Sequence, residues 1–126
     1  MPLGILLVDD EAQVRRTVTR MLQLEGHDVT ELATGADALA ELGRRGFDLV
    51  LTDIMMPDMN GCELGRAIAP SWPDQRVLYY SGHVFASLFA SGICPRDIPF
   101  IQKPFGAEDL RRRLAETMAA PPYRFE

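Results

Sequence analysis

The chain has 126 residues and a mass of 14.1 kDa, a length typical of one domain that buries roughly two-thirds of its unfolded surface. Its 13 basic and 18 acidic residues give a net charge of −5, and they form no basic stripe that could follow a phosphate backbone, so nucleic-acid binding by this chain alone is disfavoured. The first apolar run, 4–8, is far shorter than a signal-peptide core or the ~18 apolar residues of a membrane span. We therefore expect a cytoplasmic protein that does not enter a membrane.

Five apolar runs alternate with helical patterns along the chain. The runs at 4–8, 29–32, 47–52, 77–80 and 100–102 predict buried strands. Apolar residues at helical spacing predict helices over about 14–22, 38–42, 61–68, 84–90 and 110–118. Strands that alternate with covering helices indicate an α/β fold with a doubly wound, five-stranded parallel sheet. We expect one domain over 1–120 and a C-terminal tail over 121–126, of which 123–126 is frayed.

The two cysteines carry no recognisable spacing pattern. Cys62 and Cys94 are 32 residues apart, without a CxxC motif or neighbouring histidines. Neither a disulfide framework nor a zinc site is supported by this arrangement. We expect both residues to be buried or incidental thiols.

Polar side chains follow four of the five predicted strands. Asp9 and Asp10 follow the first strand, Asp53 the third, Ser81 the fourth and Lys103 the fifth. Ligands of an open parallel sheet bind beyond the carboxyl ends of its strands, so these groups are expected to converge. Lys103 is also the only lysine among the 13 basic residues. Carboxylates so close together need a cation, and Mg²⁺ is the hard ion that one or two carboxylates and several waters hold.

Each of these residues also has a simpler structural explanation. The acids at 9–11 could cap a helix, Asp53 could end a strand, Ser81 could cap a helix and Lys103 could be a solvated loop charge. The coincidence of suitable groups at four strand ends favours the joint functional interpretation. Together they could transfer a phosphoryl group to a carboxylate, with Asp53 as the nucleophile and magnesium at Asp10 and Asp53. Lys103 and Ser81 would then bind the remaining phosphoryl oxygens.

Four segments carry a family resemblance: Val-Asp-Asp-Glu at 8–11, Asp-Ile-Met-Met-Pro-Asp-Met-Asn-Gly at 53–61, Ser-Gly at 81–82 and Lys-Pro-Phe at 103–105. Over about residues 4–119 the chain resembles the receiver domain of two-component response regulators. The resemblance implies a flavodoxin-like (βα)5 fold with strand order 2-1-3-4-5 and a cis Lys103–Pro104 bond.

The same resemblance implies a role for each site residue. Asp53 would be the phosphoacceptor, Asp10 a direct Mg²⁺ ligand, Asp9 an outer-sphere ligand, and the backbone carbonyl of Met55 the third protein ligand. Ser81 would supply the hydroxyl that responds to the phosphoryl group. The chain would be a signalling switch with self-directed phosphoryl transfer and autodephosphorylation, rather than an enzyme with a free substrate.

Phe100 lies where the family has its aromatic switch residue, although it lacks the hydroxyl of the frequent tyrosine, and a core aromatic is the alternative interpretation. Two residues after Asp53 and Ser81, Met55 and His83 occupy positions that gate water in the family. For His83 we favour the alternative, a cap of the fourth helix.

The resemblance implies a histidine kinase or a phosphotransfer protein as the phosphoryl donor, and an output face formed by the fourth helix, fifth strand and fifth helix. Phe85, Leu88 and Phe89 crowd the fourth helix. We expect about half of this apolar surface to pack in the core and the rest to form a patch for an output partner or a second copy. The segments 81–83 and 101–105 are also similar to receivers of hybrid histidine kinases.

Two other functions fit the fold less well. A phosphatase or phosphotransferase working on a free substrate through an aspartyl-phosphate needs a second acid two residues after the nucleophile, where this chain has Met55. Flavin binding needs hydroxyls and amides after the first strand, and the acids at 9–11 would repel the flavin phosphate instead.

Overall fold

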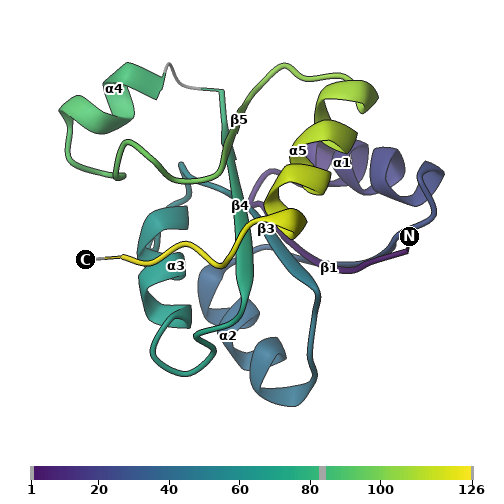
Figure 1. Ribbon diagram of the computed structural model, residues 1–126, viewed down its shortest axis with the longest axis horizontal. Coiled ribbons are helices and arrows are strands. Elements are labelled where there is room, and N and C mark those ends of the chain that lie inside the picture. The colour runs from purple at the N-terminus through teal and green to yellow at the C-terminus, as the bar shows by residue number, and fades with distance from the viewer. Residues whose placement is uncertain (1, 83–84, 126) are drawn as a thin grey trace.

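The computed structural model describes residues 2–82 and 85–125 and contains one five-stranded parallel sheet (Figure 1). The strands lie in the order β2-β1-β3-β4-β5, and every neighbouring pair is parallel. Their bounds are β1 (Gly4–Val8), β2 (Asp28–Leu32), β3 (Leu49–Asp53), β4 (Arg76–Ser81) and β5 (Phe100–Gln102). The predicted fold class and strand order are therefore confirmed.

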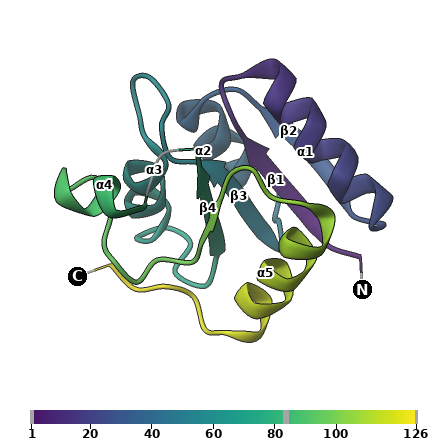
Figure 2. The ribbon, with the colours of Figure 1, turned by 90° about the horizontal axis from the view of Figure 1, so that it is seen from above.

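Helices cover both faces of the sheet. They are α1 (Ala12–Leu24), α2 (Gly35–Arg44), α3 (Gly61–Ile68), α4 (Phe85–Ala90) and α5 (Ala107–Ala119). Figure 2 shows α1 and α5 on one side of the sheet and α3 and α4 on the other. None of the helices within the described residues is long and apolar enough to cross a membrane.

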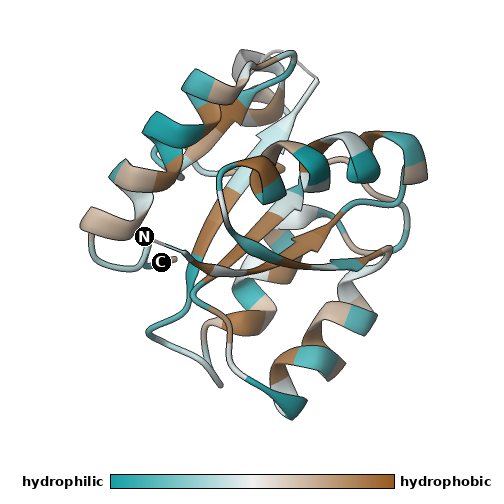
Figure 3. Cartoon of the chain, turned by 90° about the vertical axis from the view of Figure 1, so that its right-hand side faces the viewer, coloured by the Kyte–Doolittle hydropathy of each residue, from teal (hydrophilic) through white to brown (hydrophobic). Residues whose placement is uncertain are grey.

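The strands are apolar on both faces because helices cover both. Along β1, Leu6 and Val8 pack towards α2 and α3, whereas Ile5 and Leu7 pack towards α1 and α5. This alternation follows from the two-residue period of a strand, which sends successive side chains to opposite faces. In Figure 3 the strands are mostly brown, whereas the helices carry both teal and brown segments. The buried sheet forms a rigid base for the polar residues at its carboxyl edge.

The chain turns back sharply after β3, and a glycine permits the turn. The N–H of Gly61 donates to the carbonyl of Ile54 at 2.9 Å. A Cβ atom at this position would lie 2.5 Å from the carbonyl oxygen of Asp53, which no side chain tolerates. Just before it, Asn60 caps α3 by accepting the N–H of Glu63, whose side chain accepts the N–H of Asn60 in return. The loop that follows Asp53 is thereby held close to the end of β3.

The prediction that the cysteines are unpaired thiols is wrong. Cys62 and Cys94 form a disulfide, with their Cα atoms 5.8 Å apart. Both are buried, as expected. Cys62 lies in the first turn of α3 and Cys94 lies between α4 and β5, so the bond joins two segments that pack on the same face of the sheet. The pairing arises from the fold rather than from any local spacing.

The prediction of a frayed C-terminus is wrong for Tyr123 and Phe125. After α5 the chain runs back towards α3 (Figure 1), and both rings pack against the core in edge-to-face contact with each other. The Tyr123 hydroxyl donates to Asp97 at 2.6 Å, and the Arg66 guanidinium lies 4.9 Å from the centre of the Phe125 ring. The proposed boundary at residue 120 stays a prediction.

Candidate functional site

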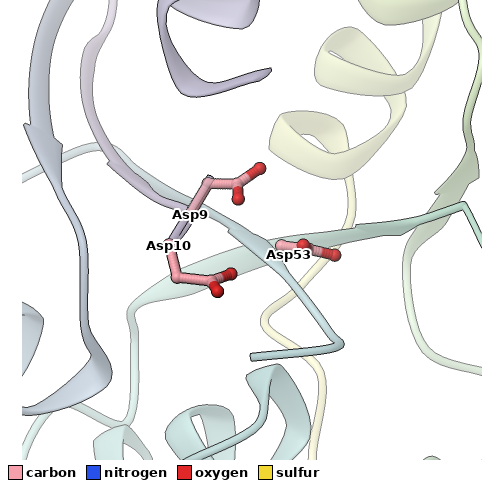
Figure 4. A group of neighbouring side chains, drawn as sticks. All are labelled: Asp9, Asp10 and Asp53. Carbon is pink, nitrogen blue, oxygen red and sulfur yellow. The ribbon is translucent and has the colours of Figure 1, made fainter. Parts of the chain in front are cut away.

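Three carboxylates meet at the carboxyl edge of β1 and β3. The two strands are neighbours, with Val8 opposite Thr52, so the residues that follow them emerge side by side. Asp9, Asp10 and Asp53 each offer an oxygen, and these oxygens lie within 4.8 Å of one another (Figure 4). Asp9 and Asp53 are buried, whereas Asp10 is exposed. The structure thus brings together the three acids that the sequence placed at one edge.

Asp9 is held on both of its carboxylate oxygens. Oδ1 accepts the backbone N–H of Glu11 at 2.9 Å, and Oδ2 accepts the hydroxyl of Tyr80 at 2.6 Å. Arg15 donates to the backbone carbonyl of Asp9 at 2.6 Å. The capping explanation is not supported, because the N–H that Asp9 accepts belongs to Glu11, which precedes α1, and the first turn of α1 holds no acid. Glu11 occupies the N-cap position, but its side chain accepts no capping hydrogen bond.

Asp53 carries the most perturbed carboxyl group of the site. Burial raises its pKa to about 6, and the negative charges of Asp9 and Asp10 act in the same direction. The Lys103 ammonium and a hydrogen bond from the Met55 backbone N–H oppose that rise. A metal-free site therefore confines more negative charge than its single ammonium compensates.

The donor set fits a hard divalent cation. Carboxylate oxygens from buried and exposed positions lie close enough to share one ion, and the exposed side leaves room for waters. Nitrogen and sulfur ligands are lacking in this cluster, which disfavours zinc. Mg²⁺, which keeps several waters and takes one or two carboxylates, matches these residues.

An open pocket of about 340 Å³ adjoins the acidic cluster. Its walls are formed by Glu11, Asp53, Met55, Ser81, Gly82 and Lys103. The three residues that sequence reasoning expected to contact a phosphoryl group therefore share one pocket with the Met55 segment. Its volume far exceeds that of a single phosphoryl group.

Lys103 reaches this pocket from the end of β5. Its N–H donates to the carbonyl of Ser81 at 2.8 Å, which continues the β4 and β5 pairing beyond the last paired residues. Its Nζ atom lies 5.0 Å from the centre of the Tyr80 ring. The Lys103–Pro104 bond is cis, as expected.

Phe100 lies away from the pocket. It is 7% exposed and packs in the cluster with α2, α3 and α4, opposite Tyr79 in the β4 and β5 register. Its position is that of a core aromatic on the sheet face opposite Tyr80, and its role as a switch stays a prediction. Of the three apolar residues expected to crowd α4, Leu88 is buried and cannot belong to an exposed patch. The side chains of Phe85 and Phe89, and the whole of His83, lie outside the described residues.

Tyr80 is the site residue that sequence reasoning missed. It was assigned only to the apolar run of the fourth strand. The available signal is its position just before Ser81, combined with the tendency of a buried tyrosine hydroxyl to find a polar partner. Predicting that partner required knowledge of the strand register, which sets Tyr80 beside Asp53.

Comparison with known proteins agrees on one family. The sequence model of one protein family, the response regulator receiver domain, matches residues 5–115. The response regulator receiver protein CpdR of Brucella abortus is 34% identical over 116 residues, which cover 92% of this chain and 97% of CpdR. The sensor kinase CckA of the same organism is 35% identical over 118 residues, which cover 90% of this chain but 12% of CckA.

Solved structures agree on the fold. NtrX from Brucella abortus, crystallised with ADP, superposes with a TM-score of 0.83 at 32% identity, and the match covers 94% of this chain and 27% of NtrX. The chemotaxis protein CheY4 of Vibrio cholerae superposes with a TM-score of 0.77 at 26% identity, covering 90% of this chain and 96% of CheY4. The similarity extends over nearly the whole chain in each comparison.

Proposed function

Because this chain belongs to the response regulator receiver domain family, we propose that Asp53 accepts a phosphoryl group from a histidine kinase or a phosphotransfer protein in the presence of Mg²⁺. Receiver domains are phosphorylation-controlled signalling switches rather than classical enzymes. One observation supports the proposal above the others: Asp53 is a buried carboxylate that shares a pocket with the only lysine of the chain and a cluster with two further acids.

The proposed chemistry is a substitution at phosphorus. A carboxylate oxygen of Asp53 attacks the phosphorus atom, the bond from phosphorus to the donor breaks, and its electron pair leaves with the donor group. The product is an acyl phosphate on Asp53. Bound Mg²⁺ neutralises charge on the carboxylates and the phosphoryl oxygens.

The other residues act on the transferred group. The Lys103 ammonium pairs with a phosphoryl oxygen as a compact point charge, and the Ser81 hydroxyl donates to another. Asp10 and Asp53, with the Met55 carbonyl, would hold the ion directly, and Asp9 would hold it through water. We propose that the new charge at this edge alters the α4, β5 and α5 face, by which an output partner or a second copy recognises the phosphorylated protein. Autodephosphorylation would reset the switch when water attacks the acyl phosphate.

Incubation with acetyl phosphate and Mg²⁺ is expected to add one phosphoryl group to the wild-type protein, detected by intact mass and removed by hydroxylamine, as an acyl phosphate should be. Asp53→Asn should remain unlabelled, because its amide is not a nucleophile of comparable strength. Asp58→Asn is the matched control, an exposed acid in the loop that follows β3, and it should be labelled like the wild type. Full labelling of Asp53→Asn would contradict the proposal.

Mg²⁺ is expected to bind weakly in the absence of a phosphoryl group, since the ion keeps most of its waters. Asp10→Ala should raise the dissociation constant by at least about tenfold, because it removes a charged direct ligand. Amide chemical shifts followed during a Mg²⁺ titration measure this constant, with Asp58→Asn again as the control. An affinity of Asp10→Ala equal to that of the wild type would mean that any metal binds elsewhere.

A further inference from the structure

Tyr80 lies in a row of residues that crosses three strands. It is opposite Asp53 in the β3 and β4 register, and Asp9 follows β1 on the other side of Asp53. Tyr80 packs in the same cluster as Leu7 and Leu51, which precede Asp9 and Asp53 by two residues. The two-residue period of a strand therefore directs Tyr80, Asp53 and Asp9 to the same face.

The Tyr80 hydroxyl donates one of the two hydrogen bonds that hold the Asp9 carboxylate. Both residues are 0% exposed, so water does not replace the 2.6 Å hydrogen bond between them. The Tyr80 phenol is the donor of this bond, because an ionised carboxylate oxygen can only accept. Without this donor one oxygen of a buried carboxylate would lose its partner, which is costly and frees the group to rotate.

The Tyr80 ring contacts a second residue of the site, Lys103. Lys103 Nζ lies 5.0 Å from the ring centre, within the range of a cation–π interaction. The Phe105 ring also packs against the Tyr80 ring in a T-shaped arrangement, with the ring centres 5.9 Å apart. Among the described residues no carboxylate lies within 4.0 Å of the Lys103 ammonium, so the Tyr80 ring is a contact of this charged group that no ion pair duplicates.

We infer that Tyr80 is a positioning residue of the phosphoacceptor site: its hydroxyl orients Asp9 for the hydration shell of Mg²⁺, and its ring holds the Lys103 ammonium over the pocket. The inference rests on the proposed function for its consequence in phosphorylation. The positions that it assigns to the Asp9 carboxylate and the Lys103 ammonium can be tested in the metal-free protein, whatever the function. Tyr80 itself touches no phosphoryl group in this scheme.

Tyr80→Phe separates the two roles because it removes the hydroxyl and keeps the ring. It should weaken Mg²⁺ binding by about tenfold, as losses of residues that orient metal ligands do. It should also shift the carboxyl carbon resonance of Asp9 in the metal-free protein. Tyr79→Phe is the matched control, since Tyr79 is equally buried on the opposite face of the same strand. It should leave both the affinity and the Asp9 signal unchanged.

Tyr80→Leu tests the ring. As the only lysine, Lys103 gives side-chain methylene signals that need no further assignment, and the Tyr80 ring should displace them upfield. Tyr80→Phe should retain this displacement and Tyr80→Leu should lose it. At saturating Mg²⁺, Tyr80→Leu should then be labelled by acetyl phosphate several-fold more slowly than Tyr80→Phe. If Tyr80→Leu fails to fold, the upfield displacement of the Lys103 methylene signals in the wild type and in Tyr80→Phe tests the role of the ring. The absence of this displacement from both proteins overturns that role.

The outcomes distinguish the inference from the proposed function. A wild-type protein that binds no Mg²⁺ and accepts no phosphoryl group contradicts the proposed function, while the metal-free Asp9 signal still tests the orienting role of Tyr80. A functional wild type with unchanged affinity and an unchanged Asp9 signal in Tyr80→Phe overturns the inference alone. Equal losses in Tyr79→Phe and Tyr80→Phe also overturn it, since they would indicate a general effect on the sheet.

Discussion

Asp53→Asn is expected to raise the free energy of unfolding of the metal-free protein by about 2–3 kcal/mol at pH 8, because burial raises the pKa of this carboxyl group from 3.8 to about 6. The folded protein at that pH holds a carboxylate that has lost most of its hydration and lies close to Asp9 and Asp10. Asparagine has nearly the same shape and no charge, so it removes the repulsion without leaving a cavity. The ionised Asp53 carboxylate therefore lowers the stability of the folded, metal-free protein.

The gain depends on pH in a defined direction. Well below pH 3.8 the Asp53 carboxyl is protonated in the folded and the unfolded protein, so the substitution changes little. Between pH 4 and 6 the unfolded chain ionises first, and the wild type loses stability as the pH rises. Urea unfolding in a metal chelator should show a gain of about 1 kcal/mol at pH 4.5 that grows to its full size above pH 7.

Two controls make this result specific. Asp58→Asn removes an exposed carboxylate of the same loop and should change the free energy of unfolding by less than about 0.5 kcal/mol. Saturating Mg²⁺ should reduce the difference in the free energy of unfolding between the wild type and Asp53→Asn. The reason is that the folded wild type binds the ion more tightly than the folded variant and is stabilised more by it. A gain that is the same at pH 4.5 and pH 8 would show that ionisation of the buried Asp53 carboxyl is not its cause.

Reduction of the Cys62–Cys94 disulfide is expected to lower the free energy of unfolding by about 3–4 kcal/mol. The bond closes a loop with a sequence separation of 32, and opening it restores the conformational entropy of that loop to the unfolded chain. The measurement compares urea unfolding of the oxidised wild type with and without a reductant. Few other single changes to a domain of this size have so large an effect on stability.

The double variant Cys62→Ala/Cys94→Ala is the control for this experiment. Its stability should be independent of the reductant, whereas the wild type should respond. Alkylation in denaturant should modify neither cysteine of the wild type before reduction and both after it. Modification of both without reduction would show that the pair is not bonded in the purified protein.

The architecture was predictable because its signals are local. Apolar runs of strand length predicted β1 and β5 with their observed bounds, and apolar residues at helical spacing predicted α3. The positions of Asp9, Asp10 and Asp53 followed from a general property of parallel sheets, whose strand ends meet at one edge. No contact had to be known in advance for these predictions.

The missed features depend on contacts between distant segments. The cysteines pair because α3 and the segment after α4 share one face of the sheet. The tail over 121–126 was predicted, but its direction depends on Asp97, which accepts the Tyr123 hydroxyl, and on Arg66, which lies over the Phe125 ring. Each of these partners is more than 25 residues away along the chain, beyond the reach of a local pattern.

Asp9, Asp53 and Tyr80 lie in one row across three strands, but they have different tasks. The acids supply the oxygen ligands, whereas Tyr80 only orients one of them. In the proposed function the acids determine which ion and which reaction the site accepts, so replacing them would change the kind of activity. Tyr80 lies one strand further across the sheet and donates a hydrogen bond to one of these acids, Asp9, so a substitution there leaves the donor set intact. Substitutions at this single strand position are therefore expected to change the Mg²⁺ affinity and the rate of phosphorylation in small steps, without altering the reaction.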